Sequence, residues 1–176
     1  MNGNVLFDIQ GLKKNFGEVE VLKGIDLNTV GVRFLHAKAY LPIVKEFVKY
    51  VEANGFDKEK VMGGTGFDAI AYLMRQNKFY RSKEEDLGEA LELVKMTEEM
   101  PKFKAVNIQG ILMHDCGATI VQELGYTLAI ANEYLAFATD KGIAVEKFAR
   151  KMECTLSISS NYFMEIAKLR AFRMLW

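Results

Sequence analysis

A histidine, an acid and a cysteine stand in direct succession at His114, Asp115 and Cys116. They follow a strongly apolar run at residues 103–112, where a strand is expected to give way to a helix. A base, an orienting acid and a thiol are the groups that nucleophilic catalysis uses. Because adjacent residues on a turn point in different directions, a working site would need side chains from other segments. The only other histidine, His36, ends another predicted strand and is the candidate to share a small site on the same rim.

The segment GTGFDA, residues 64–69, matches the G-x-G-x-x-G/A fingerprint of dinucleotide-binding folds. It follows a predicted strand and opens a predicted helix, so its glycines would let backbone N–H groups approach a pyrophosphate. In those folds the fingerprint follows the first strand, whereas here it follows the third. Two interpretations stay open, namely a nucleotide-binding α/β domain and a tight strand-to-helix turn that needs glycine.

The bulk composition excludes several function classes. Lys plus Arg and Asp plus Glu number 23 each, so the net charge is zero, and no nucleic-acid partner is expected. Cys116 and Cys154 form no C-x-x-C motif, so we predict neither a disulfide nor a metal site. The chain begins without a basic segment followed by a long apolar run and has no uninterrupted apolar stretch of about 18 residues. We therefore expect a cytoplasmic protein that does not contact membranes.

The elements that must position these residues alternate between strand and helix. Alternation of this kind predicts the α/β class, with parallel strands joined by right-handed crossovers. The predicted strands cover residues 4–9, 30–37, 60–67, 103–112 and 152–159, and the predicted helices cover about 12–22, 41–53, 68–76, 82–100, 117–140 and 161–176.

The number of units bears on the domain organisation. A closed (β/α)8 barrel takes about 250 residues, and this chain of 176 residues holds about five β/α units. We expect residues 1–176 to be a single domain, the N-terminal part of a (β/α)8 TIM barrel truncated after its fifth unit. The alternative is a complete five-stranded open sheet.

The last predicted helix carries a group of charged residues. Lys168, Arg170 and Arg173 are spaced along it, and Glu165 stands three residues before Lys168. Charges at this spacing are typical of a solvated helix face with an i,i+3 ion pair. We expect these side chains to be exposed.

Three segments resemble the methylmalonyl-CoA mutase family. NYFMEIAKLRAFRMLW, residues 161–176, is similar to a helix of that family, and NIQGILMHDCGATIVQELGYTLAIANEYL, residues 107–135, is similar to a strand and the helices after it. YLPIVKEFVKYVEANG, residues 40–55, resembles the helix after the second barrel strand. The resemblance implies the first part of a substrate-binding barrel. The intact enzyme interconverts methylmalonyl-CoA and succinyl-CoA with adenosylcobalamin.

The resemblance also implies which subunit this is. The catalytic chain of the family has a Tyr-His pair directly after the glycine that matches Gly110, and the histidine hydrogen-bonds the migrating thioester carbonyl. This sequence has Ile111 and Leu112 there, so no catalytic residues are expected. It resembles the small, non-catalytic subunit.

Other polar contacts of the catalytic chain are also altered. Its T-I-Q-N-D segment corresponds to residues 64–68, which keep only the acid, and the serine and aromatic residue of its fifth strand correspond to Glu153 and Thr155. Its substrate-contacting arginine falls on Gln76, with Arg75 one residue away. The positions at which substrate contacts are expected, if this chain makes any, are Thr65, Asp68, Gln76 and His114.

The leading hypothesis is therefore a structural partner of the catalytic large subunit in a heterodimer. The cobalamin-binding motif D-x-H-x-x-G is absent, so no cofactor is expected on this chain alone. Self-association of the fragment is expected as well, because an open barrel exposes strand edges. The alternatives are an active acyl-CoA-binding enzyme with a rim site at His36, Asp68 and His114, and a nucleotide-binding domain that uses GTGFDA.

Overall fold

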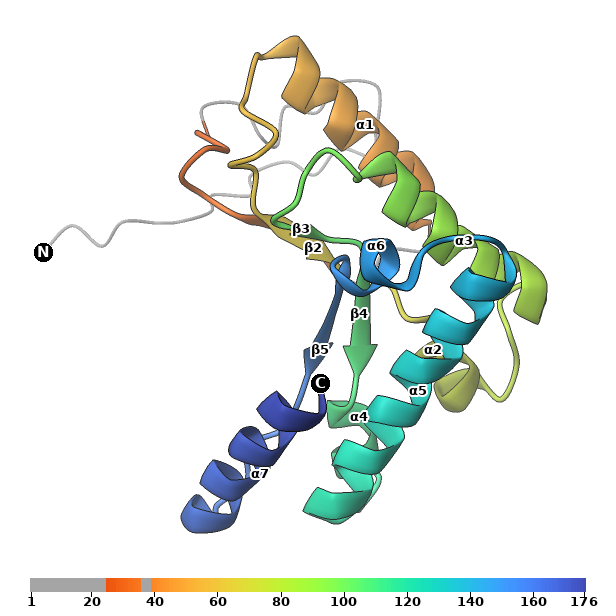
Figure 1. Ribbon diagram of the computed structural model, residues 1–176, viewed down its shortest axis with the longest axis vertical. Helices are drawn as coiled ribbons and strands as arrows, with labels where there is room; N and C mark the ends of the chain where they lie inside the picture. Colours follow the sequence, from red (N-terminus) through yellow and green to blue (C-terminus); the bar gives the residue numbers. More distant parts are fainter. Residues whose placement is uncertain (1–24, 36–38) are drawn as a thin grey trace, which may run out of the picture.

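The computed structural model describes residues 25–35 and 39–176, and the predicted strand 4–9, the predicted helix 12–22 and His36 lie outside them. The described part is α/β, as predicted, with parallel strands (Figure 1). Its elements are β1 (Val32–Phe34), α1 (Tyr40–Ala53), β2 (Gly63–Thr65), α2 (Ala69–Gln76), α3 (Lys83–Met96), β3 (Phe103–Lys104), β4 (Val106–Gln109), α4 (Ile111–Asp115), α5 (Ile120–Asp140), α6 (Val145–Ala149), β5 (Met152–Thr155) and α7 (Tyr162–Leu175).

The strands form two small sheets. One has the order β1-β2-β3, in which Arg33 stands opposite Gly64 and Gly64 opposite Lys104. The other pairs β4 with β5, so that Asn107 stands opposite Glu153. Gly63 is required in β2, because it has a φ of +142° and an added Cβ would lie 1.8 Å from the Val32 carbonyl oxygen.

The predicted strand 103–112 is interrupted at Ala105, so it serves both sheets. The backbone N–H groups of Ala105 and Val106 both donate to the Lys151 carbonyl, at 2.8 and 3.2 Å, and both side chains are buried in one core cluster. Two successive residues on one side of a strand, bonded to one acceptor, are the pattern of a β-bulge. The prediction was also wrong at its end, where α4 begins. A Cβ on Gly110 would lie 2.2 Å from Thr127 Oγ1, so the close approach of α5 requires glycine at this position.

Two core clusters hold the layers together. The first lies under α1 and contains its Phe47 and Val51; Val44, buried at the same helical spacing, as predicted, belongs to the second cluster. Phe47 stacks on Phe103 at 5.4 Å between ring centroids, which joins α1 to β3. The second cluster lies between β4 and the helices α3 and α5, and α3 also runs beside α1 in Figure 1.

Side-chain caps fix where two of these helices begin. Ser82 caps α3 by accepting the Glu85 N–H, as the S-x-x-E pattern predicted. Thr119 and Gln122 form a capping box at the start of α5, which the prediction did not include. No helix of the described residues is long and apolar enough to cross a membrane.

Only part of the charged group on α7 is the solvated face that was predicted, because the Glu165–Lys168 pair is buried. Lys168 and Glu165 are 2% and 4% exposed, because α7 packs against α5 and Lys168 contacts Glu123 on that helix. Lys168 Nζ lies 3.0 Å from Glu123 Oε2 and 2.6 Å from Glu165 Oε2, and it donates to the Ser157 carbonyl. Glu123 also accepts from the N–H and hydroxyl of Ser157, and Ser159 donates to Glu165. This set of five residues is the α5–α7 ion cluster.

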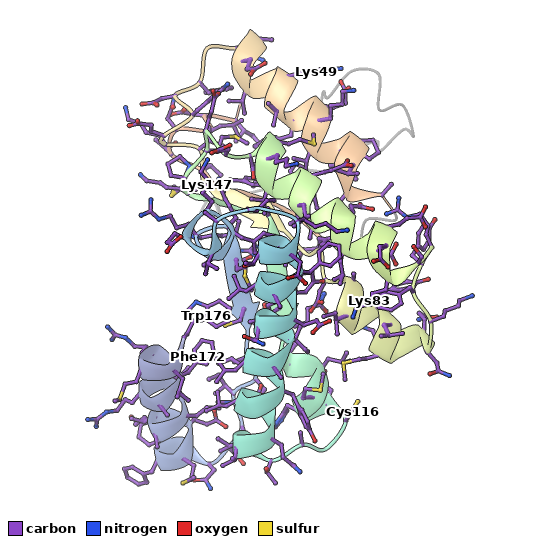
Figure 2. The ribbon with its side chains drawn as sticks, turned by 45° about the vertical axis from the view of Figure 1, so that its right-hand side comes forward. Lys49, Lys83, Cys116, Lys147, Phe172 and Trp176 are labelled. Atoms are coloured by element: carbon purple, nitrogen blue, oxygen red, sulfur yellow. The ribbon has the colours of Figure 1, made fainter. Side chains whose placement is uncertain are left out.

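The opposite side of α7 is apolar and exposed. Arg170 and Arg173 are exposed, as predicted, but Phe163 and Met174 are also 80% and 89% exposed. Phe172 and Trp176 pack against each other at 5.3 Å near the end of the helix, where Figure 2 labels them. The exposed large apolar side chains of α7 are Tyr162, Phe163, Met164, Ile166, Leu169, Met174, Leu175 and, after its last residue, Trp176.

Candidate functional site

A cavity of about 910 Å³ opens at the carboxyl ends of the strands. Parallel α/β folds bind their ligands at this edge. The interior of a packed barrel is filled by branched apolar side chains, but the strand residues that face this cavity are largely polar. The strand side chains that line the cavity are those of Arg33, Asn107, Gln109, Glu153, Cys154 and Thr155.

Asp68 lies at the cavity, but its carboxylate is occupied by the chain itself. As the N-cap of α2 it accepts the N–H groups of Ile70 and Ala71 at 3.1 and 3.0 Å. It also accepts the Gln109 N–H at 2.9 Å and the Tyr134 hydroxyl at 3.1 Å. Burial raises the pKa of the carboxyl group, and these four donors oppose that rise. Asp68 thus ties the β2–α2 turn to the end of β4 and to α5.

The glycines and helix N-terminus of GTGFDA are likewise engaged internally. A Cβ on Gly64 would lie 2.6 Å from the Lys104 carbonyl oxygen, so the spacing of β2 and β3 requires glycine there. The first N–H of α2, that of Ala69, donates to Tyr134 Oη at 2.7 Å, and the next two donate to Asp68. A pyrophosphate would need these same N–H groups. The geometry therefore favours the tight-turn interpretation over a nucleotide site.

Thr65 is fully buried and is not among the residues that line the cavity. Its hydroxyl donates to the Ala105 carbonyl at 2.6 Å and accepts the Phe67 N–H at 3.1 Å. This side chain stabilises the β2–β3 junction, where β3 leads into the bulge.

Gln76 and Arg75 line the cavity from the end of α2, and both are exposed. The Arg75 guanidinium donates to Gln109 Oε1, and Gln109 Nε2 in turn donates to the Gly66 carbonyl at 3.1 Å. Arg75 forms no ion pair with any residue that the structure describes, whereas the cavity's other arginine, Arg33, does. Arg75 therefore supplies the cavity with a positive charge that faces a neutral partner.

Arg33 and Glu153 also line the cavity, where they form an ion pair. The guanidinium and carboxylate pair in a bidentate arrangement, Nη1 with Oε1 and Nη2 with Oε2, the second pair 2.9 Å apart. The hydrogen bond to Glu153 raises the pKa of Arg33 above its ordinary value. The pair connects β1 of one sheet to β5 of the other.

Some of the residues that follow β4 line the cavity, and others lie outside it. Ile111 lines the cavity, and Leu112 packs against the main core cluster. His114 is half-buried on α4 and does not line the cavity, while Asp115 and Cys116 are exposed. Figure 2 labels Cys116 on the turn between α4 and α5. The structure thus brings Asp68 and Gln76 to the cavity and leaves His114 and Thr65 outside it.

Comparison with known proteins identifies the family. The family model for methylmalonyl-CoA mutase matches residues 17–176. The methylmalonyl-CoA mutase of Rhizobium meliloti (strain 1021) is 36% identical over 154 residues, which are 87% of this chain and 22% of that protein.

Two further relatives agree with this match. A probable methylmalonyl-CoA mutase large subunit of Mycobacterium bovis is 33% identical over 158 residues, 89% of this chain and 21% of that protein. The mitochondrial methylmalonyl-CoA mutase of Homo sapiens is 32% identical over 154 residues, 87% of this chain and 20% of that protein. The chain thus spans about a fifth of the length of these relatives. It belongs to the methylmalonyl-CoA mutase family.

Proposed function

We propose that this chain is part of the small, non-catalytic subunit of a methylmalonyl-CoA mutase and acts as a structural partner of the catalytic large subunit. The intact enzyme would interconvert methylmalonyl-CoA and succinyl-CoA. In this proposal the strands belong to a partial (β/α)8 barrel.

The observation that supports the proposal most directly is that two apolar residues, Ile111 and Leu112, follow β4. Where the catalytic chain of the family has a Tyr-His pair, Ile111 faces the cavity and Leu112 packs into the core. Neither side chain can donate a hydrogen bond to a thioester oxygen, which is the role that such a pair serves. The relatives include proteins named large subunit, so the small-subunit assignment is based on these side chains and not on the names.

The described residues do not fit a cobalamin-ligating site. His114 is the one histidine among them, and its side chain does not line the cavity. The D-x-H-x-x-G motif is also absent from the sequence. In the proposal, adenosylcobalamin supplies radical chemistry in the intact enzyme and is held outside this chain.

The proposal is tested by turnover and by association. The purified chain is mixed with adenosylcobalamin and methylmalonyl-CoA, and no succinyl-CoA is expected above the protein-free control. A tagged catalytic large subunit from the same organism is expected to retain the chain in equal amounts. Turnover by the chain alone, or a failure to co-purify, would contradict the proposal.

The isolated chain is also proposed to self-associate. Its described strands form two open sheets, and α7 exposes a continuous set of apolar side chains. Exposed strand edges and large apolar patches are the features that other chains cover.

A second candidate is an acyl-CoA-binding enzyme that uses the same cavity. The observation in its favour is Arg75, whose charge faces a neutral amide and would suit the carboxylate of an acyl group. Calorimetric titration with methylmalonyl-CoA separates the candidates. Micromolar binding that is lost in Arg75→Ala but kept in the exposed control Arg170→Ala would favour the enzyme.

A further inference from the structure

Lys151, the residue directly before β5, is a buried lysine that forms no ion pair with any residue that the structure describes. It is 4% exposed, and its Nζ donates to the backbone carbonyls of Thr97 and Met100, the second 2.6 Å away. The other buried lysine of the described residues, Lys168, is paired with two glutamates. Burying an ammonium group costs free energy unless other groups replace its water, so the two carbonyls must compensate for the water that Lys151 has lost.

These two carbonyls stand where α3 ends and the chain turns toward β3. Thr97 is the C-cap residue of α3. The Met100 carbonyl also accepts the N–H of Phe103, the first residue of β3, at 3.0 Å. Carbonyl groups at the C-terminal end of a helix have no partners within the helix and carry the negative end of its dipole, so they suit a cation. The Lys151 ammonium therefore holds the α3–β3 turn.

The backbone of the same residue holds the bulge at Ala105. The Lys151 carbonyl accepts the N–H groups of Ala105 and Val106, at 2.8 and 3.2 Å, and the Lys151 N–H donates to the Phe148 carbonyl of α6 at 2.9 Å. One residue thus joins the end of α3, the end of α6 and the bulge. Because its side chain is bound at α3, the position of its carbonyl beside the bulge is fixed as well.

We propose that Lys151 is a positioning residue whose buried ammonium fixes the bulge and thereby determines which side chains of β4 face the cavity. With the bulge in place, Asn107 and Gln109 line the cavity, whereas Val106 and Ile108 are buried in the core. Side chains alternate along a strand, so a bulge displaced by one residue would exchange these two sets. This inference concerns the polar lining of the cavity and does not depend on the proposed function.

The test is hydrogen–deuterium exchange of the 176-residue chain, resolved for single amides by NMR. Lys151→Met keeps the length of the side chain and removes its donors. We expect the N–H groups of Ala105 and Val106 to exchange at least about tenfold faster in this variant, relative to the amides of α1. Lys151→Arg, whose guanidinium can donate to both carbonyls, is expected to restore the protection. The control Lys147→Met, which removes an exposed lysine of α6, should leave the protection unchanged.

A second measurement compares the two faces of β4. The variants Asn107→Cys and Ile108→Cys place a thiol on the cavity side and on the core side, so the first is expected to react faster with iodoacetamide. Mass spectrometry of the peptides separates these thiols from Cys116 and Cys154. When Lys151→Met is added to each variant, the ratio of the two rates is expected to fall toward one.

Three results would overturn the proposal. Two of them are unchanged protection of the bulge amides in Lys151→Met and a loss in Lys151→Arg as large as that in Lys151→Met. The third is measured on the unaltered chain, so it decides even if Lys151→Met does not fold. Burial, and after it the charge of Lys104, lower the pKa of Lys151 to about 8, while Glu98 raises it. NMR titration of this side chain should have its midpoint near that value, and a midpoint at the ordinary 10.5 would place the ammonium in water.

Discussion

At the scale of the residue, Asp68 accepts hydrogen bonds beyond those that cap α2. Three backbone N–H groups and the Tyr134 hydroxyl converge on its two oxygens. Burial and the nearby Asp68 raise the pKa of Tyr134 well above its ordinary range, so its hydroxyl remains a donor. These contacts make the side chain a structural link between β2, β4 and α5.

Asp68→Ala is therefore expected to destabilise the fold by about 1–3 kcal/mol, because it leaves buried donors unpaired. Chemical denaturation measures the free energy of unfolding. The control is Asp115→Ala on the exposed side of α4, which should change stability by less than about 0.5 kcal/mol. An equal loss of unfolding free energy in both variants would mean that the hydrogen bonds to Asp68 do not stabilise the fold.

The individual site residues show where sequence reasoning stops. The spacing of GTGFDA indicated a strand-to-helix turn, and that turn is present. The assignment of substrate contacts to Thr65 and His114 came from matched positions, which do not show which way a side chain points. The Arg33–Glu153 pair joins residues 120 positions apart, and no local pattern in the sequence connects them.

At the scale of the element, α7 was predicted within one residue of its bounds at each end, but its orientation was not. The charges at Glu165 and Lys168 have the spacing of an exposed ion pair. Their partner is Glu123 on α5, which is fully buried and lies beside the predicted apolar stripe. A buried acid facing a buried lysine cannot be told from two surface charges until the helices are placed together.

Lys168→Met should destabilise the protein by about 3 kcal/mol or more, because it leaves Glu123 buried without its cation. Arg170→Met on the exposed face of the same helix is the matched control and should be nearly neutral. Thermal unfolding of the two variants compares them directly. Equal melting temperatures would show that the α5–α7 ion cluster does not stabilise the contact between the helices.

The same cluster predicts an acid-sensitive helix. The hydrogen bond from Lys168 holds the pKa of Glu165 at about 2, below its ordinary value of about 4.5. A lowered pKa in the folded state contributes stability that is complete above the unfolded value and is lost as the pH falls through the folded one. The contact of α7 with α5 is expected to weaken between pH 4.5 and 2.

Fluorescence of the single tryptophan, Trp176, reports on this change because it directly follows α7. Glu165→Gln should flatten the acid transition in that range. Glu46→Gln, which alters an exposed pair on α1, should leave it unchanged. A transition that is identical in all three proteins would assign the acid response to other groups.

At the scale of the whole molecule, the α/β class and its parallel strands followed from the alternation of the sequence. The division into two sheets did not, because it depends on the bulge at Ala105, where two successive N–H groups donate to the Lys151 carbonyl. That contact joins segments distant in the sequence, and no residue type at this position specifies it.

The exposed apolar face of α7 predicts that the isolated chain associates with itself. Sedimentation velocity over a range of concentrations should show dimers or larger species. Phe163→Lys with Met174→Lys should shift the distribution toward monomer, because both side chains are among the most exposed on that face. Tyr80→Lys, an exposed aromatic on the α2–α3 loop, is the control. A monodisperse monomer for the unaltered chain would contradict this prediction.

The bulge at Ala105 also determines which side chains of β4 belong to the ligand space. Side chains alternate along a strand, so every residue after an inserted position changes sides. Lys104 stands in the inward row, yet Asn107 and Gln109 also line the cavity while Val106 and Ile108 are buried in the core. Deleting Ala105 would reverse the two faces of β4. Val106 and Ile108 would then face the cavity, and the amides of Asn107 and Gln109 would be buried in the apolar core beneath α3 and α5.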